Sequence, residues 1–211
     1  RKGIVEGWFR ELKNGRLHGR LWVVGTPTFR CRHEVIANLP SATASWGKEL
    51  RELLVAEEGR KIVGADSSGN QFRSLAHYVN SPELTNQILS GDIHQYNADV
   101  IGTDGAAKLG QVLSGKKSPK VGTESMEKYG DAIPGLKVLR EKIESIWKQT
   151  SNTGNTEGYI PGLDGRRVYT PQPYQTLNYL LQCCEAVTTK AALAYQLKKI
   201  KCEGLDAEPR L

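Results

Sequence analysis

A short apolar segment that ends on an aspartate constrains the fold of this chain more than any other feature. Residues 61–66 (KIVGAD) have the length and composition of a buried strand. Ser67, Ser68 and Gly69 then turn the chain into a helix that runs through Tyr78. A strand that leads directly into a helix requires a core built from both element types. We therefore expect an α+β fold in which Asp66 stands at the end of a strand.

Other segments predict the remaining elements of one mixed core. Alternating polar and apolar residues predict a strand over 15–24, and a turn at 162–167 leads into a short strand over 168–170. Pro82 after Ser81 begins a helix that Gly91 ends. Apolar residues at helical spacing predict further helices over 46–56, 134–148 and 174–200, and residues 151–157 are expected to form a loop.

The composition bounds the class of protein. The 211 residues suffice for one core, or for one core plus a small lobe. No apolar stretch is long enough to span a bilayer and no signal peptide is recognisable, so we expect no membrane partner and a cytoplasmic location (the host cytoplasm for a phage-encoded protein). The four cysteines lack metal-ligand spacing, which favours reduced thiols. Because the chain begins without methionine, a fragment or a processed piece is expected.

The net charge of +6 suits a polyanionic partner, although many basic proteins bind no nucleic acid. Two basic clusters, one at Arg30, Arg32 and His33 and one at Arg166 and Arg167, could hold phosphates or sugar edges. Clusters of this kind on loops are more often plain surface charge. Both interpretations stay open at this level.

Asp66 is the first candidate for chemistry. A strand fixes the carboxylate, and the small residues after it leave room for a magnesium ion and phosphate oxygens. His94 follows the cap residue Asp92, where the free N–H groups of a first helical turn favour anions. Each has an ordinary alternative, because strand-end acids often cap the next helix and a histidine can pack against its own helix end.

A polar stripe lies on the long C-terminal helix. Asn178, Gln182, Glu185 and Thr189 are spaced so that they share one face. Amide side chains can donate hydrogen bonds to the acceptors that every base pair shows in the minor groove. The commoner explanation of such a stripe is a solvated helix face.

The order of these pieces carries more information than any one of them. The sequence resembles the family A DNA polymerases, and within them the bacteriophage T7-like branch. The resemblance covers nearly the whole chain, and its matching motifs are GRLHG (15–19), TFR (28–30) with His33 and NLP (38–40), GADSSGNQFRSLAHY (64–78), GDIH (91–94), GLDGRRV (162–168) and LNYLLQ (177–182).

The resemblance implies a palm domain with an antiparallel sheet flanked by helices, and template-directed nucleotidyl transfer to a primer 3′ end by two Mg²⁺ ions. It makes Asp66 and the Ser67 carbonyl metal ligands, and it places His94 and Gln71 at the incoming dNTP. It sets Arg30, His33, Asn178, Gln182, Arg166 and Arg167 against primer–template DNA. The implied division is palm over 1–102, a basic helical remnant of the fingers over 103–157, and palm again over 158–211.

Three departures from the family pattern stand out. The fingers helix, Arg-x-x-x-Lys followed by Tyr-Gly, is absent around Thr103 and Asp104. The hairpin bearing His-Asp-Glu, which supplies a second metal-binding carboxylate, does not occur before Leu211. Gln71 stands where the family usually has glutamate, the position that screens the sugar 2′ carbon. Because one carboxylate cannot hold two ions, we expect these 211 residues alone to be inactive or nearly so.

Three explanations fit these gaps. The first, which we favour, is that the sequence contains only the ordered residues of a longer protein and lacks a mobile fingers helix and tail. The second is a gene split over two polypeptides, and the third is a degenerate relative kept for binding. The expected function is therefore a DNA polymerase present as an incomplete chain. The alternative is a non-catalytic nucleic-acid-binding or scaffold protein on a polymerase palm. A processivity factor or a complementary polymerase fragment is a possible further partner, and a single-subunit RNA polymerase is disfavoured by GDIH and by the pair Asn178 and Gln182.

Overall fold

The computed structural model of the chain describes residues 2–36, 39–91, 95–96, 99, 130–151 and 157–208. Contacts between Cα atoms divide these residues into two compact units. Unit 1 contains the described residues of 1–25 and 31–67, and unit 2 contains residues 26–30 together with the described residues from 68 onward.

Unit 1 is built from two helices and two short antiparallel strand pairs. In chain order its elements are α1 (Lys2–Glu11), β1 (Leu12–Lys13), β2 (Arg16–Leu17), β3 (Arg20–Trp22), β4 (Arg32–Glu34) and α2 (Gly47–Glu52). Asn14 (φ 52°) and Gly15 (φ 71°) form the two-residue turn between β1 and β2, because both positions need the left-handed region that Asn and Gly tolerate best. Trp8 of α1 is buried and its Nε1 donates to the Val35 carbonyl at 2.8 Å.

The strand predicted over 61–66 is wrong. These residues are exposed and have no regular secondary structure, and the side chains of Ile62 and Val63 are 69% and 89% exposed. A strand needs a neighbour that takes up its backbone N–H and C=O groups. No strand among the described residues pairs with this segment. Asp66 therefore follows an open segment rather than a buried strand.

Two other predictions for unit 1 hold only in part. The strand predicted over 15–24 is divided into β2 and β3. The helix predicted over 46–56 ends at Glu52, since only Leu50 of its apolar residues is buried and Leu53 is 62% exposed. A short helix without a packed apolar face gains too little from tertiary contact to extend further.

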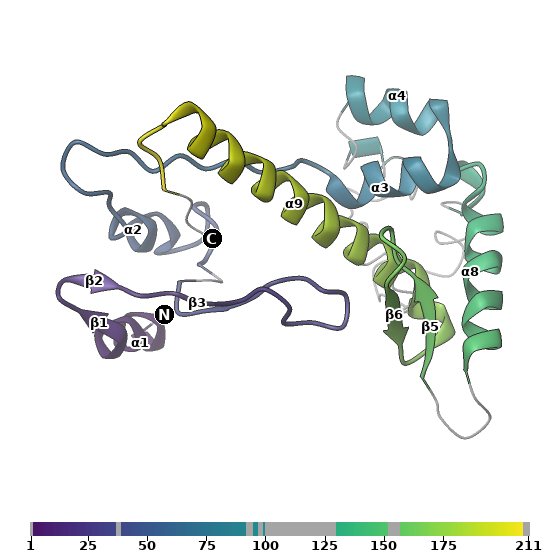
Figure 1. Cartoon of the computed structure of the whole chain (residues 1–211), viewed down its shortest axis with the longest axis horizontal. Coiled ribbons are helices and arrows are strands. Elements are labelled where there is room, and N and C mark those ends of the chain that lie inside the picture. The colour runs from purple at the N-terminus through teal and green to yellow at the C-terminus, as the bar shows by residue number, and fades with distance from the viewer. Residues whose placement is uncertain are drawn as a thin grey trace. The chain divides into compact units, whose positions relative to one another are not determined.

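Unit 2 holds most of the buried apolar residues. Its elements are α3 (Asn70–Val79), α4 (Pro82–Ser90), α8 (Leu136–Thr150), β5 (Gly158–Pro161), β6 (Arg167–Thr170), the 3₁₀ turn η1 (Pro173–Gln175) and α9 (Thr176–Glu203). Figure 1 shows α3 lying across the first half of α9, and α8 beside the β5–β6 hairpin. One core joins these elements, with Phe72 and Leu75 of α3, Ile143 of α8, and Leu177 and Leu181 of α9 all buried.

The helix boundaries of unit 2 follow from local chemistry. Ser81 accepts a hydrogen bond from the Leu84 N–H (3.2 Å), with Pro82 in the first turn and Gly91 at the end, as predicted. Gly69 (φ 62°) turns the chain into α3. The predicted apolar face of α8 is also confirmed, because Leu136 and Ile143 are buried while Leu139 and Ile146 pack against the core. α9 begins and ends within about one turn of its predicted bounds.

The β5–β6 hairpin is anchored to α8 through Trp147. The Trp147 Nε1 donates to the Thr170 carbonyl at 2.8 Å. A Cβ on Gly158 would lie 2.6 Å from the Trp147 carbonyl oxygen, so only glycine allows this close approach. Thr150 adds a second tie, since its hydroxyl bonds both the carbonyl and the N–H of Tyr159 at 2.7 and 2.9 Å. The hairpin turn at 162–166 is thereby held in one position relative to the core of unit 2.

The α+β class predicted from the sequence is confirmed, with helices and short antiparallel strand pairs in both units. Most of the predicted fingers remnant (103–157) lies outside the described residues, and its described part, 130–151 with 157, contains α8. The division at residues 102 and 157 stays a prediction. Within the described ranges, no helix is long and apolar enough to cross a membrane.

Candidate nucleic-acid interface

The first half of α9 carries a polar face that meets the loop of residues 26–30. The Thr28 hydroxyl donates to Gln182 Oε1 at 3.2 Å, although the two residues are 154 positions apart in sequence. Gln182 Nε2 in turn donates to Asn178 Oδ1 at 3.3 Å, one turn earlier on α9. Thr28 is 3% exposed, whereas Asn178 and Gln182 are half-buried. The structure thus brings the predicted amide pair into contact with the predicted loop.

Glu185 continues the same face one turn further along α9. Its Oε2 accepts a hydrogen bond from Gln71 Nε2 of α3 at 3.2 Å and lies 3.7 Å from Arg30 Nε. The Arg30 side chain is 47% exposed and that of Glu185 is 25% exposed, so solvent weakens this ion pair. The Glu185 carboxylate therefore links Arg30, which the sequence predicts at the DNA, to Gln71, which the sequence predicts at the incoming nucleotide.

Lys190 supplies a third connection between α9 and the loop. Its Nζ donates to the Phe29 carbonyl at 2.5 Å. Phe29 has φ 63°, a left-handed conformation that is rare for residues other than glycine and that the loop contacts maintain. Together Thr28, Phe29 and Arg30 are bound to α9 at three successive turns. We call these loop residues with Gln71 of α3 and with Asn178, Gln182, Glu185 and Lys190 of α9 the polar cluster.

Arg166 extends the polar cluster from the hairpin turn. Its guanidinium lies 4.5 Å from the centre of the Phe29 ring, a cation–π contact. Arg166 Nε donates to both carboxylate oxygens of Asp164, at 2.8 and 2.7 Å. This hydrogen bonding lowers the pKa of Asp164 below its ordinary value and raises the pKa of Arg166. Arg166 is thus paired and stacked, whereas Arg167 is exposed with its guanidinium 4.9 Å from the Tyr159 ring centre.

Tyr78 of α3 is partly buried and packs against the core, and Cys183 of α9 is fully buried. Burial raises the pKa of Tyr78 to about 12, and it also raises the pKa of the Cys183 thiol. Both side chains are therefore neutral at physiological pH. The four cysteines are free, as the sequence predicted.

Asp66 and Ser67 lie in unit 1, in the exposed segment without regular secondary structure. A divalent cation takes about six oxygen ligands and generally needs more than one protein carboxylate or several phosphate oxygens. In the part of the chain that the structure describes, no three His, Cys, Asp or Glu side chains are grouped so as to hold a metal ion. Asp66 with the Ser67 carbonyl does not fit a divalent ion without further ligands.

The two predicted histidines have different outcomes. His33 is exposed in β4 of unit 1, where it pairs with Leu21 of β3. His94 lies outside the described residues, as do Asp92 and the joint near Thr103 and Asp104. Their predicted roles stay predictions.

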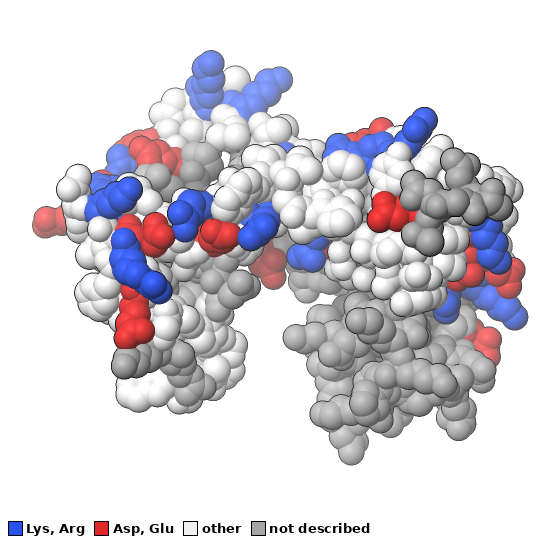
Figure 2. Space-filling model, turned by 90° about the horizontal axis from the view of Figure 1, so that it is seen from below, with Lys and Arg blue, Asp and Glu red and all other residues white. Residues whose placement is uncertain are grey.

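The surface charge of the described residues is mixed. Figure 2 shows Lys and Arg side chains interspersed with Asp and Glu side chains on the face that it displays. Many are paired, as in Arg20 with Glu11 at 3.1 Å and Arg32 with Glu34 at 3.0 Å. The net charge of +6 is therefore not gathered in one large basic patch on the described part of this face. Binding of a polyanion would depend on local groups such as those of the polar cluster.

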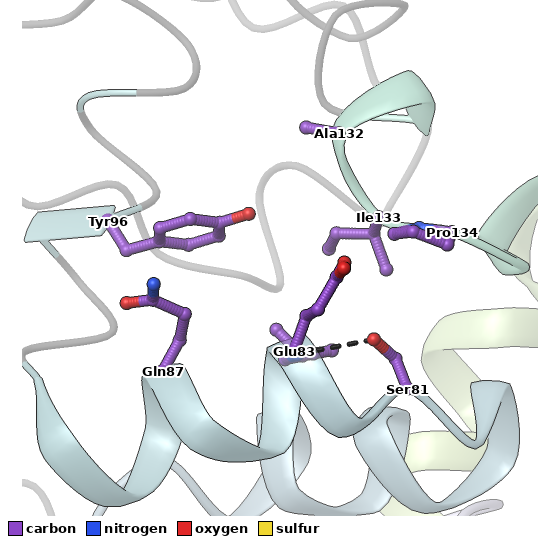
Figure 3. A pocket seen from close by; sticks show the side chains of 8 residues that line it. Ser81, Glu83, Gln87, Tyr96, Ala132, Ile133 and Pro134 are labelled. Carbon is purple, nitrogen blue, oxygen red and sulfur yellow. Dashed lines mark hydrogen bonds between the residues drawn. The ribbon is translucent and has the colours of Figure 1, made fainter.

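A separate pocket of about 240 Å³ opens beside α4 in unit 2. In Figure 3, Glu83 and Gln87 rise from α4 toward Tyr96 and Ile133, and the dashed line marks the Ser81 cap. Its described lining is Ser81, Glu83, Leu84, Gln87, Tyr96, Ala132, Ile133 and Pro134. This lining contains no residue that the sequence predicts at a site.

The parts of the polar cluster that depend on tertiary contact have no signal in the sequence. Lys190 lies beside the polar stripe, and only its hydrogen bond to the Phe29 carbonyl identifies it as part of the polar cluster. Thr28 and Asp164 occur in the matching motifs, yet no local signal assigned them partners. Glu185 was recognised as part of the stripe, but its bond to Gln71 joins residues 114 positions apart and no spacing rule reveals it.

No protein-family model matches the chain. Among curated proteins it is similar to the DNA-directed DNA polymerase of Escherichia phage T7, with 29% identity over an alignment of 222 positions that covers 88% of this chain and 31% of the relative. It is also similar to the thermostable DNA polymerase I of Thermus filiformis, with 30% identity over 177 aligned residues that cover 75% of this chain and 21% of the relative. The chain thus spans less than a third of the length of either relative.

The alignment with the DNA-directed DNA polymerase of Escherichia phage Phieco32 runs over 305 positions at 23% identity and covers 95% of this chain. Because 305 exceeds the 211 residues of the chain, that relative carries segments inside the aligned region that this chain lacks. Among solved structures, the POL domain of Pol1 from M. smegmatis, in complex with DNA primer-template and dNTP, superposes with a TM-score of 0.77 at 21% identity. The match covers 97% of this chain and 42% of that one, and it shows that the two share a fold.

Proposed function

Because the chain belongs to the family A DNA polymerases, on the T7-like branch, we propose that it is part of a template-directed DNA polymerase that extends a primer 3′ end. The resemblance predicted from the ordered motifs is confirmed by these relatives. The chain spans 31% of the phage T7 enzyme, so the activity proposed is that of the complete protein.

The polar cluster is the observation that carries this proposal. Arg30, Asn178 and Gln182 come from segments about 150 residues apart, and the fold gathers them on one face through Thr28 and Glu185. A solvated helix face would not need a buried threonine hydroxyl to hold its central glutamine. The arrangement is what a surface requires in order to present amide and guanidinium donors in fixed positions.

The partner proposed for the polar cluster is primer–template DNA near the growing end. The Asn178 and Gln182 amides would donate to the minor-groove acceptors that all base pairs share, which tests pair geometry without reading sequence. Arg30 and Arg167 would approach phosphates or sugar edges, as would His33. Arg166 would contribute through its position over Phe29, since its charge is already paired with Asp164.

For the nucleotide we propose dNTPs, with His94 at the triphosphate and Gln71 at the sugar. The metal proposed is Mg²⁺, two ions in the complete enzyme, with Asp66 and the Ser67 carbonyl as ligands. The described residues do not supply enough ligands for either ion. Both ions therefore need ligands besides Asp66 and the Ser67 carbonyl.

Primer extension by the complete polypeptide that contains these residues tests the proposal. The purified protein is given a labelled primer–template, dNTPs and Mg²⁺, and templated addition of the correct nucleotide is the expected result. Binding of the same DNA with no extension, with or without added partner proteins, would refute the proposal and favour the alternative of a non-catalytic binding or scaffold protein.

Two further proposals concern the setting of the enzyme. A processivity factor or a complementary polymerase fragment is proposed as a partner, and co-purification from expressing cells would identify it. A cytoplasmic location is proposed as well, and cell fractionation would test it.

A further inference from the structure

The side chains of Gln71 and Glu185 form a hydrogen-bonded pair between α3 and α9. Gln71 lies in the first turn of α3, and its Nε2 donates to Glu185 Oε2 of α9 at 3.2 Å. Both side chains are half-buried. The backbones that carry them are fixed, because α3 and α9 pack through the buried residues Phe72, Leu75 and Leu181.

The pair accounts for the departure at position 71. Glutamate, the usual residue there in the family that this chain resembles, would place a second carboxylate within hydrogen-bonding distance of Glu185. Two partly buried carboxylates at that separation repel each other or force one to take up a proton. Glutamine has nearly the same length, and its amide N–H donates to the Glu185 carboxylate instead. Gln71 thus avoids a second carboxylate beside Glu185 and supplies a donor to it.

Glu185 also determines which way the Gln71 amide points. With Nε2 directed at the carboxylate, Oε1 has to point away from it, since two oxygens at that distance would repel. Among the described residues Gln71 Oε1 has no hydrogen-bond partner. A charged acceptor makes the stronger kind of hydrogen bond, so it restricts the rotamers of a side chain that is otherwise free to rotate.

We propose that Glu185 is a positioning residue for sugar selection. It holds the Gln71 amide in one orientation, so that a fixed neutral side chain meets the sugar of the incoming nucleotide where relatives present a carboxylate. This inference rests on the proposed polymerase function and adds a residue on α9 to the selection of dNTPs over rNTPs. Arg30, 3.7 Å from the same carboxylate, balances its charge from the loop side.

Single-nucleotide insertion by the complete polypeptide tests the proposal. The measured quantity is the ratio of kcat/KM for a dNTP to that for the matching rNTP, in the parent and in Glu185→Ala, Glu185→Gln and Glu203→Ala. Loss of a charge-assisted hydrogen bond in a half-buried site should lower this ratio by about tenfold in Glu185→Ala, mainly through a lower KM for the rNTP.

Two variants give the comparison its controls. Glu185→Gln should keep most of the selectivity, because its carbonyl oxygen still accepts from Gln71. Glu203→Ala makes the same substitution on the same helix, where the glutamate pairs only with Lys199 at 3.6 Å among described residues, and it should leave the ratio unchanged. Thermal unfolding of each variant separates misfolding from a change in selection.

A charge exchange provides an independent arm. Gln71→Glu alone should lower insertion of both nucleotides, since it places two carboxylates together. The double variant Gln71→Glu with Glu185→Gln should restore insertion, because the donor and the acceptor have only changed places.

The outcomes separate the two proposals. A parent that extends primers while Glu185→Ala keeps the parental ratio, or loses both nucleotides equally, overturns the role of Glu185 and leaves the polymerase function standing. Failure of the exchange to restore insertion overturns the pairing. A parent that binds DNA and extends no primer overturns the proposed function and, with it, this inference.

Discussion

Truncation of Gln182 separates the binding role of the polar cluster from its structural role. Gln182→Ala removes the hydrogen bond that the amide accepts from Thr28 and the one that it donates to Asn178. Thr28 Oγ1 keeps a neighbour in Thr26 Oγ1 at 3.1 Å, so the buried hydroxyl is not left without a partner. At about 0.5–1.5 kcal/mol for each net hydrogen bond, the loss of folding free energy should be about 1–3 kcal/mol.

Gln182→Ala should slow primer extension more than a substitution that only releases the 26–30 loop from α9. Lost contact between Gln182 and a base-pair edge should raise the barrier to extension from a matched primer end by about 1–3 kcal/mol, or about 5- to 150-fold in kcat/KM. Thr28→Val removes the loop bond, fills the same volume and leaves the glutamine in place. It should cost about 1 kcal/mol of stability and much less in extension. Thr28→Ser keeps the hydroxyl and serves as the matched control.

The assays are single-nucleotide insertion at matched and mismatched primer ends, and denaturant unfolding of the same preparations. Equal losses of extension in Gln182→Ala and Thr28→Val would show that the glutamine acts only by holding the loop. Unchanged extension in a folded Gln182→Ala protein would refute the minor-groove role altogether.

Three further predictions concern other sites. Asp66→Ala should abolish primer extension by the complete protein while primer–template affinity in a gel-shift assay stays near the parental value, and residual extension with lost DNA binding would exclude the metal role. The lowered pKa of Asp164 means that its pairing with Arg166 stabilises the fold above about pH 3.8 and that this contribution is lost as pH falls through the folded-state pKa. The stability advantage of the parent over Asp164→Asn, measured by thermal unfolding, should therefore be modest at pH 7 and should shrink toward pH 3; a constant difference would contradict it. The pKa of Tyr78, raised by burial from 10.0 to about 12, means that stability is fully present below pH 10 and declines as pH rises toward 12, because the unfolded chain releases the proton first. Tyr78→Phe should remove this part of the alkaline destabilisation in denaturant unfolding at pH 9 and 11, and an unaltered pH dependence would contradict it.

Local chemistry in the sequence determined a large part of unit 2. Ser81 with Pro82 predicts where α4 begins, and the spacing of Leu136, Leu139, Ile143 and Ile146 predicts the buried face of α8. Such signals act over one or two helical turns, so they need no knowledge of the rest of the fold. The order of the motifs determined the family in the same way, because it depends on sequence alone.

The segment at 61–66 shows where local signals fail. Its composition favours a buried strand, yet Ile62 and Val63 are exposed because no described strand lies beside them. Strand formation depends on a partner that can be distant in sequence, whereas a helix satisfies its own backbone hydrogen bonds. The strand predicted to end at Asp66 is therefore wrong, while the metal-binding role that its motif indicates stays a prediction.

Only the tertiary structure brings the residues of the polar cluster together. The sequence supplied Arg30, Gln71, Asn178, Gln182 and Glu185 as separate candidates, each with an ordinary alternative as surface charge or a solvated face. Only the packing of α3 and of the 26–30 loop against α9 brings Thr28 to Gln182 and Gln71 to Glu185. Contacts across more than 100 residues arise from the shared core, and no spacing in the sequence encodes them.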